Sequence, residues 1–415
     1  MRKLLFLFLV LTFAACSNLK EPSGPGITSA CVSAPAPWIG LDTAPAPMDT
    51  SLGAAEPVLR AVTYNIHSGM GQWKGLWRSR ATVQRHLDGI ADAIAGTAPA
   101  PVDIVALNEV DFSARRSGGI DQARYLAEAL ERRSGARYHV IYGRTRERLA
   151  PGFDGSYGNA VLVRYDVSES KACLYDDTRA CGIADAPAGM PGLRASGFLQ
   201  RAVREARGII KLTLDFHGHP VDVIVTHLEA VALQEREAQA SHLLRRFVDP
   251  GRTTVVLGDM NAVPTVMTRS RAFAKADRTH DILTSGSLAD ARVLYDARLG
   301  RTDFRAWATY PANAPVWPLD TALGSLDLIP YEARVMDARD SDHRGFYIAY
   351  RVTRNGLLVD AQRSRHDAIR RRQLAQILAC DIAGTRSNTL HWLRARTEFS
   401  GLSSVEATAT PVPAL

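Results

Sequence analysis

The feature that most constrains the fold is an apolar run that ends abruptly in polar residues, Val255-Val256-Leu257-Gly258-Asp259-Met260-Asn261. Short β-branched and aliphatic runs next to turn residues predict a buried strand. Gly258 permits a sharp change of direction, so Asp259 and Asn261 are delivered close together at the strand end. Because a buried carboxylate is costly unless it is paired or hydrogen-bonded, this strand end indicates a functional site. A simple polar turn is the alternative for the motif taken alone.

The 415-residue chain is long enough for one large domain or two ordinary ones. With 46% hydrophobic and 22% charged residues, its composition is that of a globular protein with a sizeable core. The net charge of +7 is concentrated in the tail, since nine arginines and five acidic residues follow Thr353. The remaining chain is close to neutral, so composition does not demand a basic surface for nucleic acid.

The N-terminus has the layout of a secretory signal peptide, with two basic residues before the apolar run Leu4–Ala15. This run is well short of the ~20 residues that span a bilayer as a helix. Phe13-Ala14-Ala15-Cys16 resembles the lipobox of bacterial lipoproteins, which implies removal of residues 1–15 and acylation of Cys16. An ordinary cleaved signal is the alternative. We therefore expect an exported protein, lipid-anchored to the bacterial envelope at the outer membrane and facing the periplasm or the surface.

Export implies an oxidising compartment, in which cysteines can pair. Cys173 and Cys181 bracket a short polar segment and are the expected disulfide. Whether Cys31 pairs with Cys380 is left open, because connectivity cannot be deduced from sequence. The absence of a CxxC spacing from the sequence disfavours a cysteine-ligated zinc site.

Composition divides the mature chain into three segments. Residues 16–57 are rich in Ala and Pro, which is typical of an extended linker between an anchor and a domain. Residues 58–353 form the expected main domain, with an inserted loop predicted at 166–204. Residues 354–415 are a basic C-terminal extension, in which apolar residues at helix spacing predict an amphipathic helix around Ala368–Ala383.

Strand and helix patterns alternate through the main domain. Helices are predicted at 81–95, 122–132 and 234–247, and strands at 58–64, 103–107, 137–142, 158–164, 208–216, 221–226, 255–257, 319–323, 333–337 and 346–352. This alternation, with hairpin-like pairs interspersed, favours an α/β fold of the α+β four-layer sandwich type. We expect two mixed β-sheets packed face to face, with helices on the outside.

Further polar residues stand at the ends of the predicted strands. Asn65, Glu109 and His227 each close a strand, Asp320 opens one, and Asp342-His343 precedes the last. Each has an ordinary explanation when taken singly: a turn residue, a solvated helix start, a satisfied core histidine or a polar turn. All of them together, in this order, are poorly explained by chance.

This ordered set resembles the endonuclease/exonuclease/phosphatase superfamily of metal-dependent phosphohydrolases. The resemblance spans roughly Val58 to Val352 and is specific for the superfamily but only weakly specific for a substrate. The pieces that carry it are Thr63-Tyr64-Asn65, Asp103-Ile104-Val105-Ala106-Leu107-Asn108-Glu109, Tyr157-Gly158-Asn159-Ala160, Thr226-His227-Leu228, Gly258-Asp259-Met260-Asn261 and Ser341-Asp342-His343.

The resemblance implies a metal cofactor, Mg²⁺ with Mn²⁺ as an alternative. Glu109 is the implied principal ligand, with Asn65 and Asp342 nearby, directly or through water. This assignment agrees with chemistry, because a hard cation takes oxygen ligands and neutralises the charge that develops in phosphoester cleavage.

The resemblance also implies the catalytic roles. Asp259 would orient or deprotonate the attacking water, and Asn261 would hold the nucleophile or the phosphoryl oxygens. His227 and His343 would donate hydrogen bonds to the phosphate, and Asn159 would bind the substrate. Contributions of this kind are typically worth ~10²–10⁴-fold each.

A histidine in such a role needs an orienting carboxylate, as in other catalytic dyads. Asp320 and Asp327 both precede His343 in the sequence. Thr309-Tyr310-Pro311, followed by Leu319-Asp320, matches the family's Thr-aromatic-Pro…aliphatic-Asp pattern. We therefore predict that Asp320 orients His343.

Three departures from the family pattern weaken the inference of a substrate. Asn108 stands where Gln usually precedes the metal-binding Glu, and Arg344-Gly345 stands where Leu-Pro often follows Asp-His. Glu229 occupies a position at which bacterial sphingomyelinases tend to carry Gln.

The near-neutral domain and the lipid anchor favour an exported Mg²⁺-dependent phosphoesterase that acts by in-line attack of an activated water. Its expected partners are a phosphodiester or phosphomonoester, such as a phospholipid head group or an inositol phosphate, and a membrane surface through the N-terminal anchor. An extracellular or periplasmic DNase or RNase is the alternative, although a nuclease would be expected to show a broad basic surface. A non-catalytic envelope binding protein on the same fold is the alternative of another class.

Overall fold

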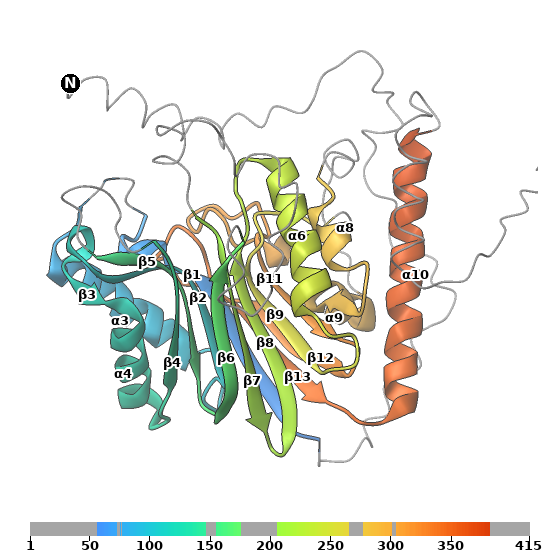
Figure 1. Cartoon of the computed structure of the whole chain (residues 1–415), viewed down its shortest axis with the longest axis horizontal. Helices are drawn as coiled ribbons and strands as arrows, with labels where there is room; N and C mark the ends of the chain where they lie inside the picture. Colours follow the sequence, from blue (N-terminus) through green and yellow to red (C-terminus); the bar gives the residue numbers. More distant parts are fainter. Residues whose placement is uncertain are drawn as a thin grey trace, which may run out of the picture.

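The computed structural model describes residues 56–72, 75, 77–146, 155–175, 206–264, 277–300 and 304–381. These residues form two mixed β-sheets packed face to face, with α3 and α4 on one side and α6, α8 and α9 on the other (Figure 1). The four-layer sandwich predicted from the sequence is confirmed. The predicted signal peptide, the lipidated Cys16 and residues 16–55 of the predicted linker lie outside the described residues, as do Cys31 and Cys181.

The first sheet has the strand order β12-β13-β1-β2-β5-β4, with β3 paired to β2. Its strands β1 and β2 run parallel, whereas β13 pairs antiparallel with β1 and β5 with β2. The strands are β1 (Val58–Asn65), β2 (Ile104–Ala114), β3 (Ile120–Asp121), β4 (His139–Arg146), β5 (Ser156–Val163), β12 (Leu328–Val335) and β13 (Phe346–Val352).

The second sheet has the strand order β10-β11-β9-β8-β7-β6. Its central strands β8 and β9 run parallel, and the flanking pairs are antiparallel. The strands are β6 (Val167–Leu174), β7 (Gly208–Phe216), β8 (His219–His227), β9 (Thr254–Asp259), β10 (Leu288–Asp290) and β11 (Asp320–Ser325).

Helices cover the outer faces of both sheets. They are α3 (Arg80–Ala95), α4 (Gln122–Ser134), α6 (Leu233–Phe247), α8 (Thr279–Leu283), α9 (Ala291–Leu299) and α10 (Gly356–Asp381), with short 3₁₀ turns η1 (His67–Gly69), η2 (Arg115–Ser117) and η5 (Phe304–Trp307). Capping interactions fix the start of α3 and the end of α4. The side chain of Ser79 accepts a hydrogen bond from the backbone of Thr82 at the start of α3, and Gly135 ends α4 in the left-handed conformation.

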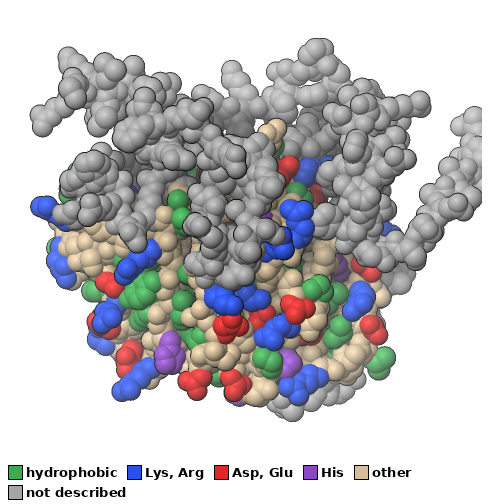
Figure 2. Space-filling view, viewed as in Figure 1, with side chains coloured by type: hydrophobic (Ala, Val, Ile, Leu, Met, Phe, Trp, Pro, Cys, Tyr) green, Lys and Arg blue, Asp and Glu red, His purple; other side chains and the backbone are tan. Residues whose placement is uncertain are grey.

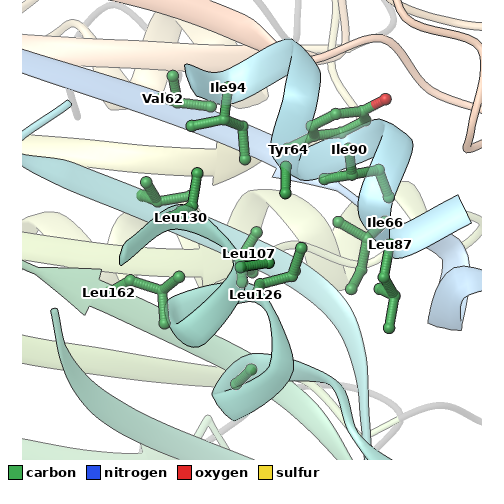
Figure 3. Packing of buried hydrophobic residues seen from close by; sticks show 14 of the residues in the cluster. Val62, Tyr64, Ile66, Leu87, Ile90, Ile94, Leu107, Leu126, Leu130 and Leu162 are labelled. Atoms are coloured by element: carbon green, nitrogen blue, oxygen red, sulfur yellow. The ribbon is translucent and has the colours of Figure 1, made fainter. Parts of the chain in front are cut away.

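The helix α3 shows how sequence spacing produces packing. Leu87, Ile90 and Ile94 recur on one face of the helix and are buried. Figure 3 shows them beside Val62 and Tyr64 on the outer face of β1. Each such aliphatic side chain contributes about 1.5–3 kcal/mol when it leaves water, so this face of the helix holds it on the sheet.

The core between the two sheets is built from the opposite face of each strand. One buried cluster joins both sheets and includes Leu59 and Ala61 of β1, Val223 and Val225 of β8, and Val255 and Leu257 of β9. Because side chains alternate along a strand, Asn65, His227 and Asp259 continue these inward rows at the strand ends. The predicted site residues therefore lie at one end of the inter-sheet core.

One expectation from the sequence is wrong in detail, and some short elements were missed. The predicted inserted loop at 166–204 begins with the strand β6, which pairs antiparallel with β7. The polar residues of this edge strand from Ser168 to Lys171 are exposed, so the strand lacks the apolar alternation that signals a half-buried strand. The short elements α8, β10 and α9 were also not predicted.

The helix predicted around Ala368–Ala383 begins earlier, because α10 starts at Gly356. It packs on the domain beyond α9 (Figure 1), where Ile369 joins the apolar residues Ala289, Val293 and Leu294. Gln362 donates hydrogen bonds to the carbonyls of Leu326 and Leu328 at 3.0 and 2.9 Å. The side chains from residue 372 onward, which carry the predicted apolar face of Leu374, Ile377, Leu378 and Ile382, lie outside those described. Within the described part of the chain, we find no helix with the length and apolar character needed to span a membrane.

Candidate functional site

Strand pairing brings the predicted polar residues to one edge of the sandwich. In the second sheet, His227 of β8 and Asp320 of β11 both stand opposite Asp259 of β9. In the first sheet, β1 ends at Asn65, and its antiparallel neighbour β13 begins just after His343. The structure therefore places these residues together, as expected if they form one site.

The turn after β9 depends on Gly258. This glycine has φ +148°, and a Cβ at this position would lie 1.8 Å from the carbonyl oxygen of Thr226 on the neighbouring strand. After it, the backbone N–H of Asn261 donates to Oδ1 of Asp259 at 2.9 Å, with Asn261 itself at φ +49°. A side chain larger than hydrogen at residue 258 would push β8 and β9 apart, so glycine is required here.

Asp259 is the centre of the site. Its Oδ2 accepts a hydrogen bond from Asn65 at 3.1 Å and lies 3.5 Å from Nε2 of His227 and 3.7 Å from Nε2 of His343. Burial raises the pKa of the Asp259 carboxyl, the charge of Asp320 adds to the rise, and His343 and hydrogen bonds from Asn261 and Asn65 oppose it. A carboxylate with a raised pKa is a stronger base than one in water.

His343 is paired with a carboxylate on its far side. Its Nδ1 lies 2.8 Å from Oδ2 of Asp320, and both side chains are buried. Burial alone would lower the pKa of His343, but Asp320 and Asp259 outweigh it and raise the pKa to about 10. His343 is therefore an imidazolium at neutral pH. Asp327, the alternative carboxylate, instead accepts hydrogen bonds from Thr253 and Ser325.

His227 has the opposite kind of partner. Its Nδ1 lies 2.8 Å from Nη1 of Arg207, a guanidinium that can only donate. Burial and the charges of Arg207 and His343 hold the pKa of His227 well below its usual value of 6.5. His227 is therefore neutral. Its Nε2 faces Asp259 and the side-chain amide of Asn261, which lies 3.0 Å away and also donates to the carbonyl of Leu228.

Glu109 stands at a β-bulge rather than at a strand end as predicted. The strand β2 continues to Ala114, and its pairing with β5 shifts between Leu107 and Val110. Glu109 has φ +56°, and Asn65 donates to its Oε1 at 2.9 Å. A bulge re-aims one side chain without ending the strand, which is how Glu109 reaches the same edge as Asp259.

Asp342 lies beside the loop that follows β1. Its Oδ1 is 3.6 Å from Nδ1 of His67, and the hydroxyl of the preceding Ser341 donates to the carbonyl of Asn65 at 2.7 Å. The Oδ1 of Asn65 accepts from the backbone N–H of His67 at 3.1 Å. Asn65 therefore links two segments: its side chain contacts Glu109, and its backbone carbonyl contacts the segment of Asp342.

Among the described residues, no group of three or more His, Cys, Asp or Glu side chains is arranged to hold a metal ion. The two predicted carboxylate ligands, Glu109 and Asp342, offer the oxygen donors that a hard divalent cation such as Mg²⁺ takes. This cation is usually bound by one or two carboxylates and keeps several waters, unlike a zinc ion in a closed cage. The predicted ligand role of Asn65 fits contact through water, because its amide already holds Glu109 and Asp259.

Asn108 has a role that the sequence did not reveal. It is fully buried, and its Nδ2 donates to Oδ1 of Asn159 at 2.9 Å and to the carbonyl of Thr226 at 3.0 Å. Its Oδ1 accepts from the backbone N–H of Asp259 at 2.9 Å. One amide therefore links β2, β5, β8 and β9 directly beneath Asp259. In the sequence, Asn108 differed from the Gln that is usual in the family, but that difference did not indicate this structural role.

Asn159, predicted to bind substrate, is 3% exposed and makes internal hydrogen bonds. Its Oδ1 accepts from Asn108, and its Nδ2 donates to the carbonyl of Gly208 at 3.4 Å. These bonds hold β5 against the start of β7. Its role toward a substrate stays a prediction.

Two buried arginines were missed by sequence reasoning. Arg207 directly precedes the strand paired with that of His227, and this position is the signal that could have revealed it. Arg292, completely buried, donates to the carbonyls of Pro318 and Asp320 at 2.9 and 3.0 Å and fixes the start of β11. Nothing in the sequence distinguishes Arg292 from an exposed arginine of a helix.

Comparison with known proteins identifies the family of the chain and agrees with its fold. The model of a family described as the endonuclease/exonuclease/phosphatase family matches residues 62–343. Among solved structures, the endonuclease/exonuclease/phosphatase from Beutenbergia cavernae is 21% identical, with TM-score 0.52 over 71% of this chain and 72% of that one. The corresponding protein from Bacteroides vulgatus is 17% identical, with TM-score 0.49 over 72% of this chain and 100% of that one. A search of curated proteins found no match.

Proposed function

The chain belongs to the endonuclease/exonuclease/phosphatase family, whose members are hydrolases acting on phosphoester bonds, and from this premise we propose that it is a Mg²⁺-dependent phosphoesterase. The single observation that carries the proposal is the environment of the Asp259 side chain. This buried carboxylate lies between one charged and one neutral histidine, and Asn65 joins it to Glu109.

In the proposed reaction, water attacks the phosphorus in line with the leaving oxygen, so that one P–O bond forms while the P–O bond to the leaving group breaks. The departing oxygen takes up a proton from solvent. Asp259, whose basicity is raised by burial, takes the proton of the attacking water. His343 as an imidazolium and His227 as a neutral donor stabilise the charge that grows on the phosphoryl oxygens. Glu109 and Asp342 would hold the Mg²⁺ ion, which would supply further neutralisation of that charge. Asn261, fixed by the turn after β9, would hold the nucleophile or the same oxygens through its amide.

We propose that the substrate is a phospholipid head group, an inositol phosphate or a similar phosphoester rather than nucleic acid. On the face drawn in Figure 2, Lys and Arg side chains are interspersed with Asp and Glu instead of forming one basic patch. Binding to a DNA or RNA backbone relies on such basic surfaces. The near-neutral balance of the sequence outside the C-terminal extension supports the same choice.

We also propose that the protein is exported and anchored by a lipid on Cys16. The apolar run before Ala14-Ala15-Cys16 supports this proposal, as does the disulfide bond formed by Cys173. Metabolic labelling with palmitate tests it. Label should enter the wild-type protein and be absent from Cys16→Ser, and equal labelling of the two would contradict the anchor.

A substrate panel tests the proposed reaction. The purified mature protein is incubated with bis-p-nitrophenyl phosphate, sphingomyelin vesicles, an inositol phosphate and plasmid DNA, each with Mg²⁺ and with a chelator. We expect chelator-sensitive hydrolysis of the small diester and of a lipid or inositol substrate. Faster cleavage of plasmid DNA than of these substrates would identify a nuclease instead. Binding of a phosphoester without turnover of any would identify the non-catalytic alternative.

A further inference from the structure

Arg207 reaches the site from outside the motifs that define the family. It stands just before β7, which pairs antiparallel with β8 so that Ile209 lies opposite Thr226. This register brings Arg207 alongside the end of β8, where its Nη1 lies 2.8 Å from Nδ1 of His227. Both side chains are buried, with 8% and 4% exposed. The contact between Arg207 and His227 therefore lies in the protein interior.

The chemistry of this contact determines where the proton of His227 resides. A guanidinium has N–H donors and no acceptor, and it keeps its charge at any accessible pH. Nδ1 of His227 must therefore be the acceptor, and the single ring proton lies on Nε2. That nitrogen has two polar neighbours, Oδ2 of Asp259, an acceptor at 3.5 Å, and Nδ2 of Asn261, a donor at 3.0 Å that also donates to the carbonyl of Leu228. Because a neutral ring carries one proton, that proton is favoured on the side of the Asp259 carboxylate rather than beside the Arg207 guanidinium.

Glu229 supplies the counter-charge that a buried arginine requires. Its Oε2 lies 3.8 Å from Nε of Arg207, while its Oε1 accepts from the backbone N–H groups of Val231 at 3.0 Å and Ala232 at 3.4 Å. Glu229 itself is 7% exposed. Glu229, which stands where sphingomyelinases tend to carry Gln, therefore pairs with Arg207. The three side chains are linked in the order Glu229–Arg207–His227.

The other charged groups that face His227 come from β9 and from the segment before β13. They are Asp259 and the imidazolium of His343. A proton added to His227 would place a third positive charge beside Arg207 and His343. It would also pair with Asp259 and weaken that carboxylate as a base. The arrangement of charges thus favours a neutral His227 and a basic Asp259.

We propose that Arg207, held by Glu229, is a positioning residue that locks His227 as a neutral donor from Nε2. The two histidines that flank Asp259 then differ in charge, because His343 is paired with a carboxylate and His227 with a guanidinium. This role rests on the proposed function, since a fixed donor matters to turnover only if a phosphoryl oxygen binds there. The state of the His227 ring is nevertheless measurable without any substrate.

Three variants of the mature protein test this role. Arg207→Met removes the donor and the charge, whereas Arg207→Lys keeps a charged donor. Arg252→Met is the matched control, because Arg252 also pairs with a buried carboxylate, that of Asp222, near the other end of β8.

The first readout is the ¹⁵N spectrum of the histidine rings, recorded without substrate on both sides of the ordinary histidine pKa of about 6.5. In the wild type and in Arg252→Met, we expect Nδ1 of His227 to stay unprotonated and Nε2 to stay protonated throughout. In Arg207→Met, we expect the ring to titrate or to populate the other tautomer, and Arg207→Lys should restore the wild-type pattern. A wild-type pattern in Arg207→Met would overturn the proposal.

The second readout is kcat/KM on bis-p-nitrophenyl phosphate as a function of pH. Arg207→Met should lose about 10²-fold, the cost of removing one preorganised donor. The loss should be greatest at acidic pH, where a protonated His227 pairs with Asp259. Arg207→Lys should recover most of the rate, and Arg252→Met should match the wild type. Equal pH profiles for Arg207→Met and the wild type would overturn the role, whereas an inactive wild type with the expected ring spectrum would refute only the proposed function.

Discussion

Nδ1 of His343 lies 2.8 Å from Oδ2 of Asp320, and both side chains are buried. Asp320 opens β11 of one sheet, whereas His343 lies just before β13 of the other. This pair joins the sheets at the edge where Asp259 is presented. It also holds a positive charge 3.7 Å from that carboxylate, measured from Nε2 of His343. A histidine that stays protonated in this position can donate to a phosphoryl oxygen without first acquiring a proton.

Asp320→Asn should lower kcat by about 10²–10⁴-fold, because an amide can accept from Nδ1 of His343 but cannot hold the imidazolium. The pKa of His343 should fall from its value of about 10. Asp327→Asn is the matched control, since Asp327 belongs to the turn between β11 and β12 and contacts Thr253 and Ser325. Steady-state kinetics of both variants distinguish the two carboxylates. A larger loss in Asp327→Asn would show that the orienting residue is misassigned.

Glu109→Gln should raise the Mg²⁺ concentration needed for half-maximal activity by at least the ~10–100-fold that loss of a metal's outer-shell partner costs. The amide preserves the size of the side chain but removes the charge that attracts the cation. Activity is measured across a Mg²⁺ titration, with Glu128→Gln on the exposed face of α4 as the control. An unchanged Mg²⁺ dependence in Glu109→Gln would argue against Glu109 as a ligand.

Asn108→Ala should destabilise the fold by at least about 1–3 kcal/mol, because it strands buried polar groups that the amide now satisfies. Those groups are the backbone N–H of Asp259, the side chain of Asn159 and the carbonyl of Thr226. Urea unfolding measures the change, and turnover should fall with it since Asp259 loses a fixed backbone position. If Asn108→Ala were as stable as the wild type, the link that Asn108 makes between the two sheets would be dispensable.

His366 on α10 should make stability depend on pH. Burial and the charge of Arg370 lower the pKa of His366 to about 4, compared with about 6.5 in an unfolded chain. Between these values the unfolded chain binds more protons than the folded one, so the free energy of unfolding falls as pH drops below about 6.5. The linked free energy is on the order of 3 kcal/mol. Above that pH the contribution is constant.

His366→Gln removes this titration, and its free energy of unfolding should vary less between acidic and neutral pH than that of the wild type. Urea unfolding at several pH values measures both curves. Parallel curves would show that His366 is not buried against the domain as described, and that α10 docks through other contacts.

The sequence predicted the parts of the fold that follow from apolar periodicity. The strand Phe346–Val352 and the helix α3 agree with their predicted ranges to within one residue, because both bury a regular apolar face. The edge strand β6 was missed, since polar side chains cover its exposed face. The start of α10 was also missed, because polar residues such as Gln362 and His366 anchor it to the domain.

The candidate site was predictable where polar residues interrupt apolar strands. Asp259 and His227 follow buried runs, and their meeting requires only that parallel strands end at one edge. Asn108 was not predictable as part of the site, because its role depends on hydrogen bonds between segments distant in sequence. Arg207 was missed although its position, just before the strand that pairs with the strand of His227, could have indicated it. The bulge that presents Glu109 was hidden for a similar reason, since it is defined by a shift in pairing with β5.

The most direct test compares the rate of bis-p-nitrophenyl phosphate hydrolysis by the wild-type protein and by Asp259→Asn, each with Mg²⁺, after chelation and after Mg²⁺ is restored. We expect the wild type to turn over only with the metal and to recover fully when Mg²⁺ is restored. We expect Asp259→Asn to be folded but slower than the wild type by about 10²–10⁴-fold whenever Mg²⁺ is present. Turnover that survives chelation, or that Asp259→Asn retains at the wild-type rate, would contradict a metal-dependent site centred on Asp259.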